Sequence, residues 1–177
     1  GEDQGYKGKA VELESFTDVP GKGLQGAYQG VSVQLGHSRW MNELGYDLTA
    51  VQEDILQFEE QGASVSVLAI DGVISAMWAV EDELRPETIE VVKELHAQGI
   101  DVWMLTGDNR RTAQYIAKQA GIAHVIAEVL PQDKASKVKE LQDKGLVVGM
   151  VGDGINDAPA LVTADIGFAI GSGTDIA

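Results

Sequence analysis

The chain has 177 residues, a formal net charge of -15 and no cysteine. This length is enough for one or two hydrophobic cores, and the negative charge argues against nucleic acid or an anionic membrane surface as a partner. The absence of cysteine excludes a disulfide framework and a thiolate site, and no apolar run approaches the roughly 20 residues that would span a bilayer.

Short strands separated by turns are predicted near the start of the chain. The expected strands cover residues 11–19, 24–28 and 31–35. Gln29-Gly30 stands between two alternating runs, which is typical of a hairpin. A helix capped by Asp47 or Thr49 is then predicted to run to about Gln61. Residues 1–80 are therefore expected to form an antiparallel, β-rich domain.

Gly21, Gly23 and Gly26 spell the pattern GxGxxG. A dinucleotide-binding fingerprint requires a helix to follow, but residues 27–33 continue as a strand. A kinase glycine loop would require lysine, HRD and DFG motifs downstream, and the sequence has none of them. Two interpretations stay open, a turn where the backbone approaches a ligand closely and a tight hairpin end. His37 has no second histidine at ligand spacing, so we expect a solvent-facing or ligand-stacking imidazole.

Asp71 ends an apolar strand, as the nucleophile of haloacid dehalogenase-type phosphohydrolases does. However, the second acid two residues on is missing, the threonine that should follow is missing, and another strand follows at once. Asp71-Gly72 between two β-rich runs favours a hairpin turn. A soluble phosphatase that uses Asp71 remains an alternative.

After Glu81 the pattern changes to strands that alternate with helices. The expected helices begin at Pro86, Arg110 and Pro131 and end near residues 99, 120 and 143, and the expected strands cover residues 100–105, 123–127 and 146–151. This alternation is typical of right-handed βαβ units and a parallel sheet. We therefore place a domain boundary near Glu81, with one domain in residues 1–80 and a second, α/β domain in residues 81–177.

Polar groups follow the strands of this second domain. They are Thr106, Gly107 and Asp108 after one strand, Lys134 at a helix start, and Asp153, Asn156 and Asp157 in the turn after the next strand. In a parallel sheet these positions lie at one edge. A hydroxyl, backbone amides, an ammonium and carboxylates that hold Mg²⁺ are the groups that phosphoryl transfer requires.

Each of these groups also has a simpler interpretation. Asp108 or Asn109 serves as a helix cap, Lys134 as a solvated first-turn residue, and the acidic turn as an Asx turn at the surface. An EF-hand is excluded because Ile155 occupies a ligand position. A lysine near a helix N-terminus opposes the macrodipole, so Lys134 indicates an anion nearby.

Three segments closely resemble the phosphorylation domain of heavy-metal P-type ATPases, namely residues 104–109, 130–134 and 150–161. Residues 20–23 and 36–40 look like the glycine motif and the Gly-Asn motif of that family's nucleotide-binding domain. Residues 171–175 look more like the copper branch than the zinc and cadmium branch. The resemblance implies an α/β fold with two domains. The phosphorylation domain would be haloacid-dehalogenase-like, with a parallel sheet. The nucleotide-binding domain would be an antiparallel, β-rich α+β domain and would be incomplete.

The resemblance also implies roles for single residues. Asp153 and Asp157 would hold Mg²⁺, with Asn156 ordering the site. Thr106 and Gly107 would contact the phosphoryl group, Asp108 would place nucleotide and Mg²⁺, and Lys134 would bind phosphate. Gly21, Gly23 and Gly36 would let the backbone lie against ATP, and His37 stands where the family usually has asparagine.

Two segments of the family are missing from this chain. They are the Asp-Lys-Thr-Gly-Thr segment with the phosphorylated aspartate and the Ser-Glu-His-Pro segment that contacts adenine. We therefore expect a fragment that lacks the first strand of its phosphorylation domain and is inactive alone. The intact protein would sit with these domains at the cytoplasmic face of a membrane. Its partners would be ATP, its own membrane helices and a copper chaperone, and it would couple ATP hydrolysis to the export of Cu⁺. The alternatives are a zinc or cadmium transporter and a non-catalytic nucleotide-binding module.

Overall fold

The computed structural model describes residues 13–81, 83–153 and 157–170. These residues group into two compact units. The first unit lies within residues 1–57 and 65–80, and the second lies within residues 58–64 and 81–177. Along the described ranges, no helix is both long and apolar enough to cross a membrane.

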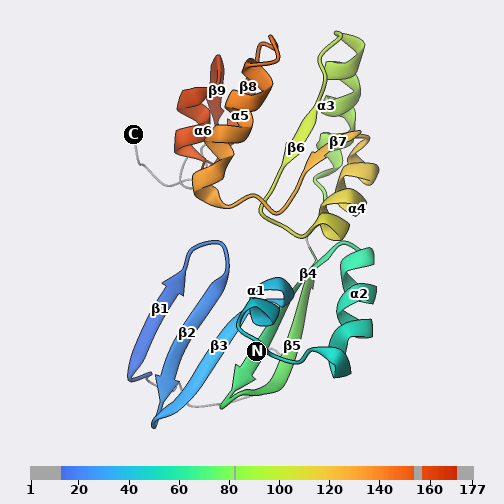
Figure 1. Cartoon of the computed structure of the whole chain (residues 1–177). Coiled ribbons are helices and arrows are strands. Elements are labelled where there is room, and N and C mark those ends of the chain that lie inside the picture. Colours follow the sequence, from blue (N-terminus) through green and yellow to red (C-terminus); the bar gives the residue numbers. More distant parts are fainter. Residues whose placement is uncertain (1–12, 82, 154–156, 171–177) are drawn as a thin grey trace. The chain divides into compact units, whose positions relative to one another are not determined.

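The first unit is built on a five-stranded sheet with the order β1-β2-β3-β4-β5 (Figure 1). The strands are β1 Ser15–Val19, β2 Gly23–Tyr28, β3 Val31–His37, β4 Ala63–Ile70 and β5 Val73–Glu81. The first four strands pair antiparallel with their neighbours. The predicted antiparallel, β-rich fold is therefore confirmed.

Two hairpin turns of this sheet have left-handed backbone at both central residues. The φ angles are 51° and 76° at Gln29 and Gly30, and 50° and 82° at Asp71 and Gly72. This is the conformation of the type I′ turn, whose twist matches that of the flanking strands. The predicted hairpins at both sites are confirmed, and Asp71 is a turn residue.

Helices pack on the sheet of the first unit and supply its core. They are α1 Ser38–Glu43 and α2 Gln52–Glu60, the latter preceded by the 3₁₀ turn η2 Thr49–Val51. The Asp47 carboxylate accepts hydrogen bonds from the Thr49 hydroxyl at 2.6 Å and from its amide at 2.9 Å, which lowers the pKa of Asp47. The buried side chains are Trp40, Met41, Leu48, Ile55 and every second residue of β4 from Ala63 to Ala69. The period of two in β4 follows from the pleat of a strand.

The second unit alternates helices and strands, as predicted (Figure 1). The helices are α3 Pro86–Ala97, α4 Arg110–Ala120, α5 Lys134–Gln142 and α6 Ala158–Thr163, with the 3₁₀ turn η3 Pro131–Asp133 before α5. The strands are β6 Trp103–Leu105, β7 His124–Ile126, β8 Gly149–Gly152 and β9 Ile166–Ala169. β6 pairs parallel with β7, and β8 pairs parallel with β9. Among the described residues these are two separate sheets, whereas the sequence predicts one continuous parallel sheet.

The start and end of α4 follow from local sequence. Asn109 accepts a hydrogen bond from the Thr112 amide at 3.0 Å and so caps the first turn, and Gly121 ends the helix with a left-handed φ of 77°. Thr112, Ala113, Ala117 and Ala120 are buried, at the spacing of one helical face. The helix therefore covers exactly the range that the sequence predicts, 110–120.

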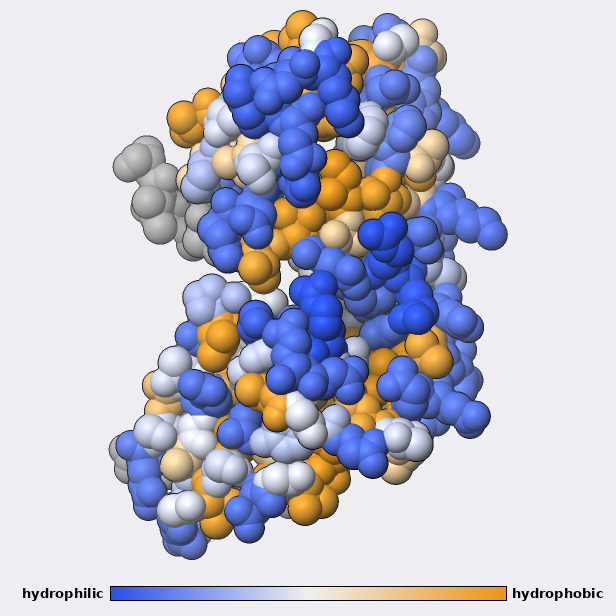
Figure 2. All heavy atoms as spheres, in the orientation of Figure 1, coloured by the Kyte–Doolittle hydropathy of each residue, from blue (hydrophilic) through white to orange (hydrophobic). Residues whose placement is uncertain are grey.

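The core of the second unit has a cluster around β8. Val138, Met150 and Ala160 are buried, and Leu105 of β6 packs against them. Figure 2 shows apolar side chains at several places on an otherwise polar surface. Around β8 and β9 the exposed ones include Val147, Val151, Val162 and Phe168, and all four residues of β9 are exposed.

Candidate functional site

The turn after β6 is fastened to the chain that follows β7. The Thr106 amide donates to the Ile126 carbonyl at 3.0 Å, and the Val129 amide donates to the Thr106 carbonyl at 3.1 Å. A third backbone hydrogen bond, from the Glu128 amide to the Asp108 carbonyl, measures 2.9 Å. The backbone of residues 106–108 is therefore held at the carboxyl end of a parallel strand pair, where α/β folds bind ligands.

The side chains of this turn bond to one another. The Thr106 hydroxyl donates to Asp108 Oδ2 at 2.7 Å, and the Asp108 amide donates to the Thr106 hydroxyl oxygen at 3.1 Å. The Ser64 hydroxyl donates to Asp108 Oδ1 at 3.2 Å. Gly107 and Asp108 are exposed to solvent. Because Asn109 is the cap of α4, the Asp108 carboxylate does not serve as that cap.

Lys134 and Asp157 form an ion pair in the second unit. Lys134 Nζ lies 2.6 Å from Asp157 Oδ1, and the two side chains are only 16% and 12% exposed. Lys134 is the first residue of α5, and Asp157 is the N-cap residue of α6. The anion that the position of Lys134 predicts is therefore present within the chain, and the interpretation of Lys134 as a solvated residue is wrong.

Gly152, at the end of β8, makes room for this pair. A Cβ atom at residue 152 would lie 2.6 Å from Asp157 Oδ2, which is too close for any side chain. Asp153 follows directly and is exposed. Asn156, which the sequence also places in the site, lies outside the described residues.

Within the described part of the chain, the predicted catalytic side chains fall into two hydrogen-bonded groups. Thr106 bonds with Asp108, and Lys134 bonds with Asp157. The packing of Leu105, next to Thr106, against Met150 of β8 brings the β6 and β8 strands into one core. The two groups thus follow two strands that share a core, without a direct hydrogen bond between them.

The predicted nucleotide-contacting glycines lie in the first unit, where they pack against Trp40. Gly23 and Gly36 face each other across β2 and β3. A Cβ atom at Gly23 would lie 2.9 Å from the Trp40 ring, and one at Gly36 would lie 2.3 Å from it. Trp40 itself is 4% exposed. The sequence pattern shows the glycines but not the indole and the backbone carbonyls of Leu35 and Lys22, which leave no room for a side chain at these positions.

His37 is bound to the backbone through both ring nitrogens. Nδ1 accepts from the Trp40 amide at 3.0 Å, which caps α1. An accepting Nδ1 leaves the proton on Nε2, so Nε2 donates to the Gly21 carbonyl at 3.0 Å. The expectation of a solvent-facing or ligand-stacking ring missed this role. His37 instead ties the glycine turn at Gly21, whose φ is 68°, to the start of α1.

The same glycine turn carries a salt bridge. Lys22 Nζ lies 2.6 Å from Glu43 Oε2 at the end of α1. The hydrogen bond from Lys22 lowers the pKa of the Glu43 carboxyl. The glycine turn is therefore tied to the start of α1 by His37 and to its end by Glu43.

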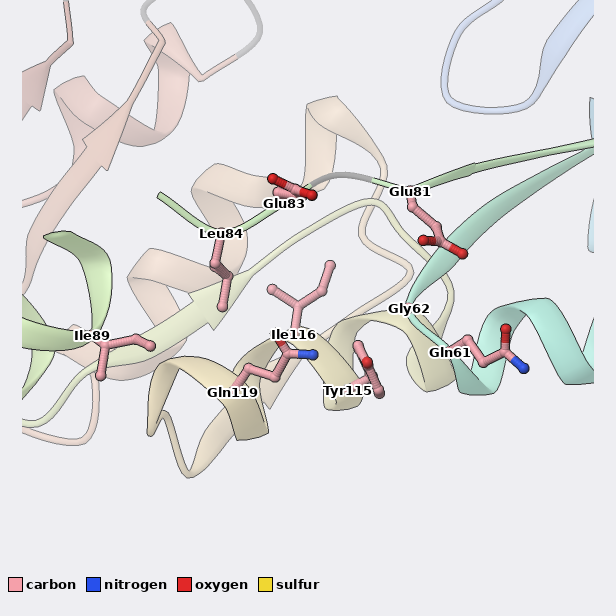
Figure 3. A pocket seen from close by; sticks show the side chains of 9 residues that line it. All are labelled: Gln61, Gly62, Glu81, Glu83, Leu84, Ile89, Tyr115, Ile116 and Gln119. Carbon is pink, nitrogen blue, oxygen red and sulfur yellow. The ribbon is translucent and has the colours of Figure 1, made fainter. Parts of the chain in front are cut away.

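A pocket of about 350 Å³ lies in the second unit, away from the predicted site residues (Figure 3). Its lining residues are Gln61, Gly62, Glu81, Glu83, Leu84, Ile89, Tyr115, Ile116 and Gln119. Tyr115 lies against Gly62, because a Cβ atom there would be 2.4 Å from the ring. No sequence motif indicated this pocket.

The described residues contain no cluster of three or more histidine, cysteine, aspartate or glutamate side chains arranged to hold a metal ion. This does not conflict with Mg²⁺. Mg²⁺ keeps several waters and is usually bound through one or two carboxylates together with substrate phosphates. Asp153, directly after β8, and Asp157, at the start of α6, fit that kind of donor set.

Comparison with known proteins gives the family. A model of the haloacid dehalogenase-like hydrolases matches residues 5–165. The chain therefore belongs to the haloacid dehalogenase-like hydrolases. It is also 48% identical over 172 residues to a probable copper-transporting ATPase, PacS, of Synechococcus elongatus, covering 96% of this chain and 23% of that protein.

One further relative agrees, and a solved structure matches the fold. A copper-exporting P-type ATPase of Legionella pneumophila is 47% identical over 93% of this chain and 22% of its own length. The solved catalytic domain of the CPx-ATPase CopB-B matches the fold with a TM-score of 0.70 at 24% identity, covering 98% of this chain and 60% of that one. The predicted resemblance to the heavy-metal P-type ATPases is confirmed. The chain spans less than a quarter of the length of PacS and of the Legionella ATPase.

Proposed function

We propose that this chain is the ATP-binding and Mg²⁺-dependent phosphoryl-transfer region of a P-type ATPase. The intact protein would couple ATP hydrolysis, through an aspartyl phosphate, to the export of Cu⁺ across a membrane. The observation that carries the proposal is the Lys134–Asp157 pair, at 2.6 Å and mostly buried, which adjoins Asp153 at the end of a parallel strand. An ammonium and two carboxylates at such a strand end are suited to hold a phosphoryl group and its cation.

Lys134 and Asp157 would act as a pair of opposite charges at the phosphate. The ammonium would neutralise phosphoryl oxygens, while Asp157 fixes its position and is itself fixed by the glycine at residue 152. Asp153 and Asp157 would hold Mg²⁺, with Asn156 ordering the loop between them. When bound, Mg²⁺ would offset the charge that develops on the transferring group.

The Thr106 turn would receive the phosphoryl group. The Gly107 amide is a hydrogen-bond donor at the carboxyl end of β6, and a donor fixed in advance stabilises developing charge best. The Thr106 hydroxyl, whose one proton goes to Asp108, would hold that carboxylate beside the phosphoryl group. Asp108 accepts from Thr106 and would place nucleotide and Mg²⁺. A side chain at residue 107 would come within 3.3 Å of the Val129 carbonyl, so glycine suits close approach here.

ATP would lie against the glycine turn of the first unit. Gly21 is exposed there and Gly23 is partly exposed, whereas Gly36 is buried against Trp40 and would shape the turn from beneath. His37 would act through Gly21 by holding its carbonyl. The pairing of Gly23 with Gly36 beside Trp40 supports a rigid turn. We therefore assign residues 1–80 to the C-terminal part of a nucleotide-binding domain and residues 81–177 to a phosphorylation domain.

The phosphorylated aspartate is expected on a strand that this chain does not contain. β6 and β8 each pair on one side only among the described residues, and β9 is exposed along its whole length. Val151 of β8 is 57% exposed. A strand with the Asp-Lys-Thr-Gly-Thr segment would pair with both β6 and β8 and cover this surface. Without it the chain should turn over no ATP, and without the Ser-Glu-His-Pro segment that contacts adenine it should bind ATP weakly.

The partners of the whole protein follow from its relatives. Their names, a probable copper-transporting ATPase and a copper-exporting P-type ATPase, support Cu⁺ as cargo. We propose that these domains lie at the cytoplasmic face of a membrane, joined to membrane helices, and that a copper chaperone delivers the ion. The net charge of -15 supports the absence of a nucleic-acid partner.

The test is acid-stable phosphorylation from Mg²⁺-ATP. The chain alone should give no labelled band, whereas a protein in which this chain follows an Asp-Lys-Thr-Gly-Thr strand should give one. Asp153→Asn should abolish that band, and Asp71→Asn, in the hairpin turn, should leave it unchanged. A labelled band with the chain alone, or residual phosphatase activity that Asp71→Asn removes, would overturn the proposal.

A further inference from the structure

The Asp108 carboxylate receives a hydroxyl on each of its oxygens. Thr106, two residues before it, donates to Oδ2 at 2.7 Å, and Ser64, 44 residues before it, donates to Oδ1 at 3.2 Å. We propose that Ser64 is a positioning residue, which holds the Asp108 carboxylate in the orientation that phosphoryl transfer uses. This inference rests on the proposed function, because that function gives Asp108 its role.

The position of Ser64 is set by its neighbour Ala63. The Thr112 hydroxyl donates to the Ala63 carbonyl at 2.6 Å, and Ala63 and Thr112 are 0% and 1% exposed. Asn109 Nδ2 donates to the same Thr112 hydroxyl at 2.8 Å. Buried hydrogen bonds of this kind are costly to break, so the backbone beside Ser64 stays fixed to the first turn of α4.

Two more contacts fasten the same segment to α4. Arg111 Nη1 lies 3.1 Å from Glu59 Oε2, and Glu59 is 3% exposed. The Tyr115 ring lies against Gly62, where φ is 92°. Residues 59–64 thus contact α4 at Arg111, Thr112 and Tyr115. The hydrogen bond of Ser64 adds a contact to Asp108, two residues before the helix begins.

A second donor matters because a carboxylate rotates easily. The terminal torsion of aspartate has a broad, roughly two-fold profile, and its χ1 torsion has three staggered wells, so one hydrogen bond leaves both the rotamer and the plane of the group poorly fixed. Hydroxyls on both oxygens, from two segments of chain, fix that plane. A site that is oriented in advance avoids the cost of reorganisation during the reaction. Loss of Ser64 alone leaves the Thr106 contact in place, so the effect should be partial.

The chain offers a matched control. Ser66 lies two residues further along β4, so its side chain is on the same face of the strand as that of Ser64. Ser66→Ala removes the same hydroxyl chemistry from the same strand without touching Asp108. Ser64→Thr keeps a hydroxyl at residue 64 and should rescue the function.

The first measurement uses the chain itself and requires no activity. Three-bond NMR couplings report the χ1 rotamer of Asp108. We expect one rotamer in the wild type, in Ser64→Thr and in Ser66→Ala, and averaged couplings in Ser64→Ala. A single, unchanged rotamer in Ser64→Ala would overturn the inference, even if phosphorylation from ATP were established.

The second measurement uses the intact transporter that contains this chain. Ser64→Ala should raise the Mg²⁺-ATP concentration for half-maximal phosphoenzyme about three- to tenfold, the change in affinity that corresponds to the net free energy of one hydrogen bond. Ser64→Thr should stay within about twofold of the wild type by the same scale. Equal effects of Ser64→Ala and Ser66→Ala would overturn the inference. A wild-type protein that forms no phosphoenzyme would instead overturn the proposed function, and the rotamer measurement would still decide the role of Ser64.

Discussion

Removing the lysine of the Lys134–Asp157 pair should destabilise the second unit strongly. In Lys134→Met the Asp157 carboxylate, only 12% exposed, would lose the partner that lies 2.6 Å away. Removing one member of a buried ion pair costs about 3–5 kcal/mol, because the other charge is left without compensation. Since both side chains keep some contact with solvent, we expect about 3 kcal/mol, the lower end of that range.

The converse change should cost more. Asp157→Asn would leave an ammonium at the N-terminus of α5, where the helix dipole opposes a positive charge. In Lys134→Met the remaining carboxylate lies instead at the N-terminus of α6, where the dipole favours it. The two dipole effects together predict that Asp157→Asn destabilises by about 1 kcal/mol more than Lys134→Met. The double variant should cost less than the sum of the two single changes.

The assay is amide hydrogen exchange of α5 and α6 in increasing urea. A single optical signal would mix the two units, whereas exchange reports the second unit by itself. Lys139→Met is the control on the same helix. The Lys139–Asp143 pair is 63% and 64% exposed, so its loss should cost no more than about 1 kcal/mol. Equal costs for Lys134→Met and Lys139→Met, or a smaller cost for Asp157→Asn than for Lys134→Met, would refute the reasoning.

Three further changes test other parts of the fold. Gly36→Ala should destabilise the first unit by about 1–3 kcal/mol, because the added Cβ would lie 2.3 Å from Trp40. Amide hydrogen exchange in increasing urea measures this cost for the first unit by itself, and a neutral outcome would contradict this packing. Thr112→Val should cost about 1–3 kcal/mol by the same assay, since it leaves the buried Ala63 carbonyl without its donor, whereas Thr112→Ser should cost less. Hydrogen bonds, first from the Val148 backbone amide, lower the pKa of Asp165 in the folded protein. The stability that ionised Asp165 adds is therefore complete above the usual pKa of 3.8 and is lost as pH falls through the lower pKa of the folded state. The stability difference between the wild type and Asp165→Asn should therefore be present at pH 7 and shrink below about pH 4, and a difference independent of pH would contradict the assignment.

Local patterns were sufficient to predict most of the elements. Asn109 and Gly121 mark both ends of α4 by capping chemistry that acts within one turn. Asp71-Gly72 forms a hairpin turn because both residues accept left-handed backbone. β9 was not predicted, and among the described residues the expected single parallel sheet is divided, because strand pairing depends on partners that are distant in sequence.

The site was predictable in its residue types but not in its contacts. Thr106 and Asp108 are only two residues apart and were both assigned to the site, but the hydrogen bond between them was not predicted. Ser64 lies 44 residues away from Asp108, and no motif includes it. The Lys134–Asp157 distance likewise depends on how α5 and α6 pack, which the spacing of the two residues does not determine.

The packing of Gly23 and Gly36 against Trp40 has a consequence for how such glycine motifs evolve. An added Cβ would also lie 2.2 Å from the Leu35 carbonyl at Gly23 and 2.6 Å from the Lys22 carbonyl at Gly36, so a smaller side chain at position 40 makes room at neither glycine. In related chains, both positions should therefore remain glycine even where residue 40 differs. A loss of ATP binding in Gly36→Ala would by itself measure this steric conflict as much as any contact with the nucleotide. Measuring the stability of the first unit of Gly36→Ala alongside its ATP binding would separate the two effects.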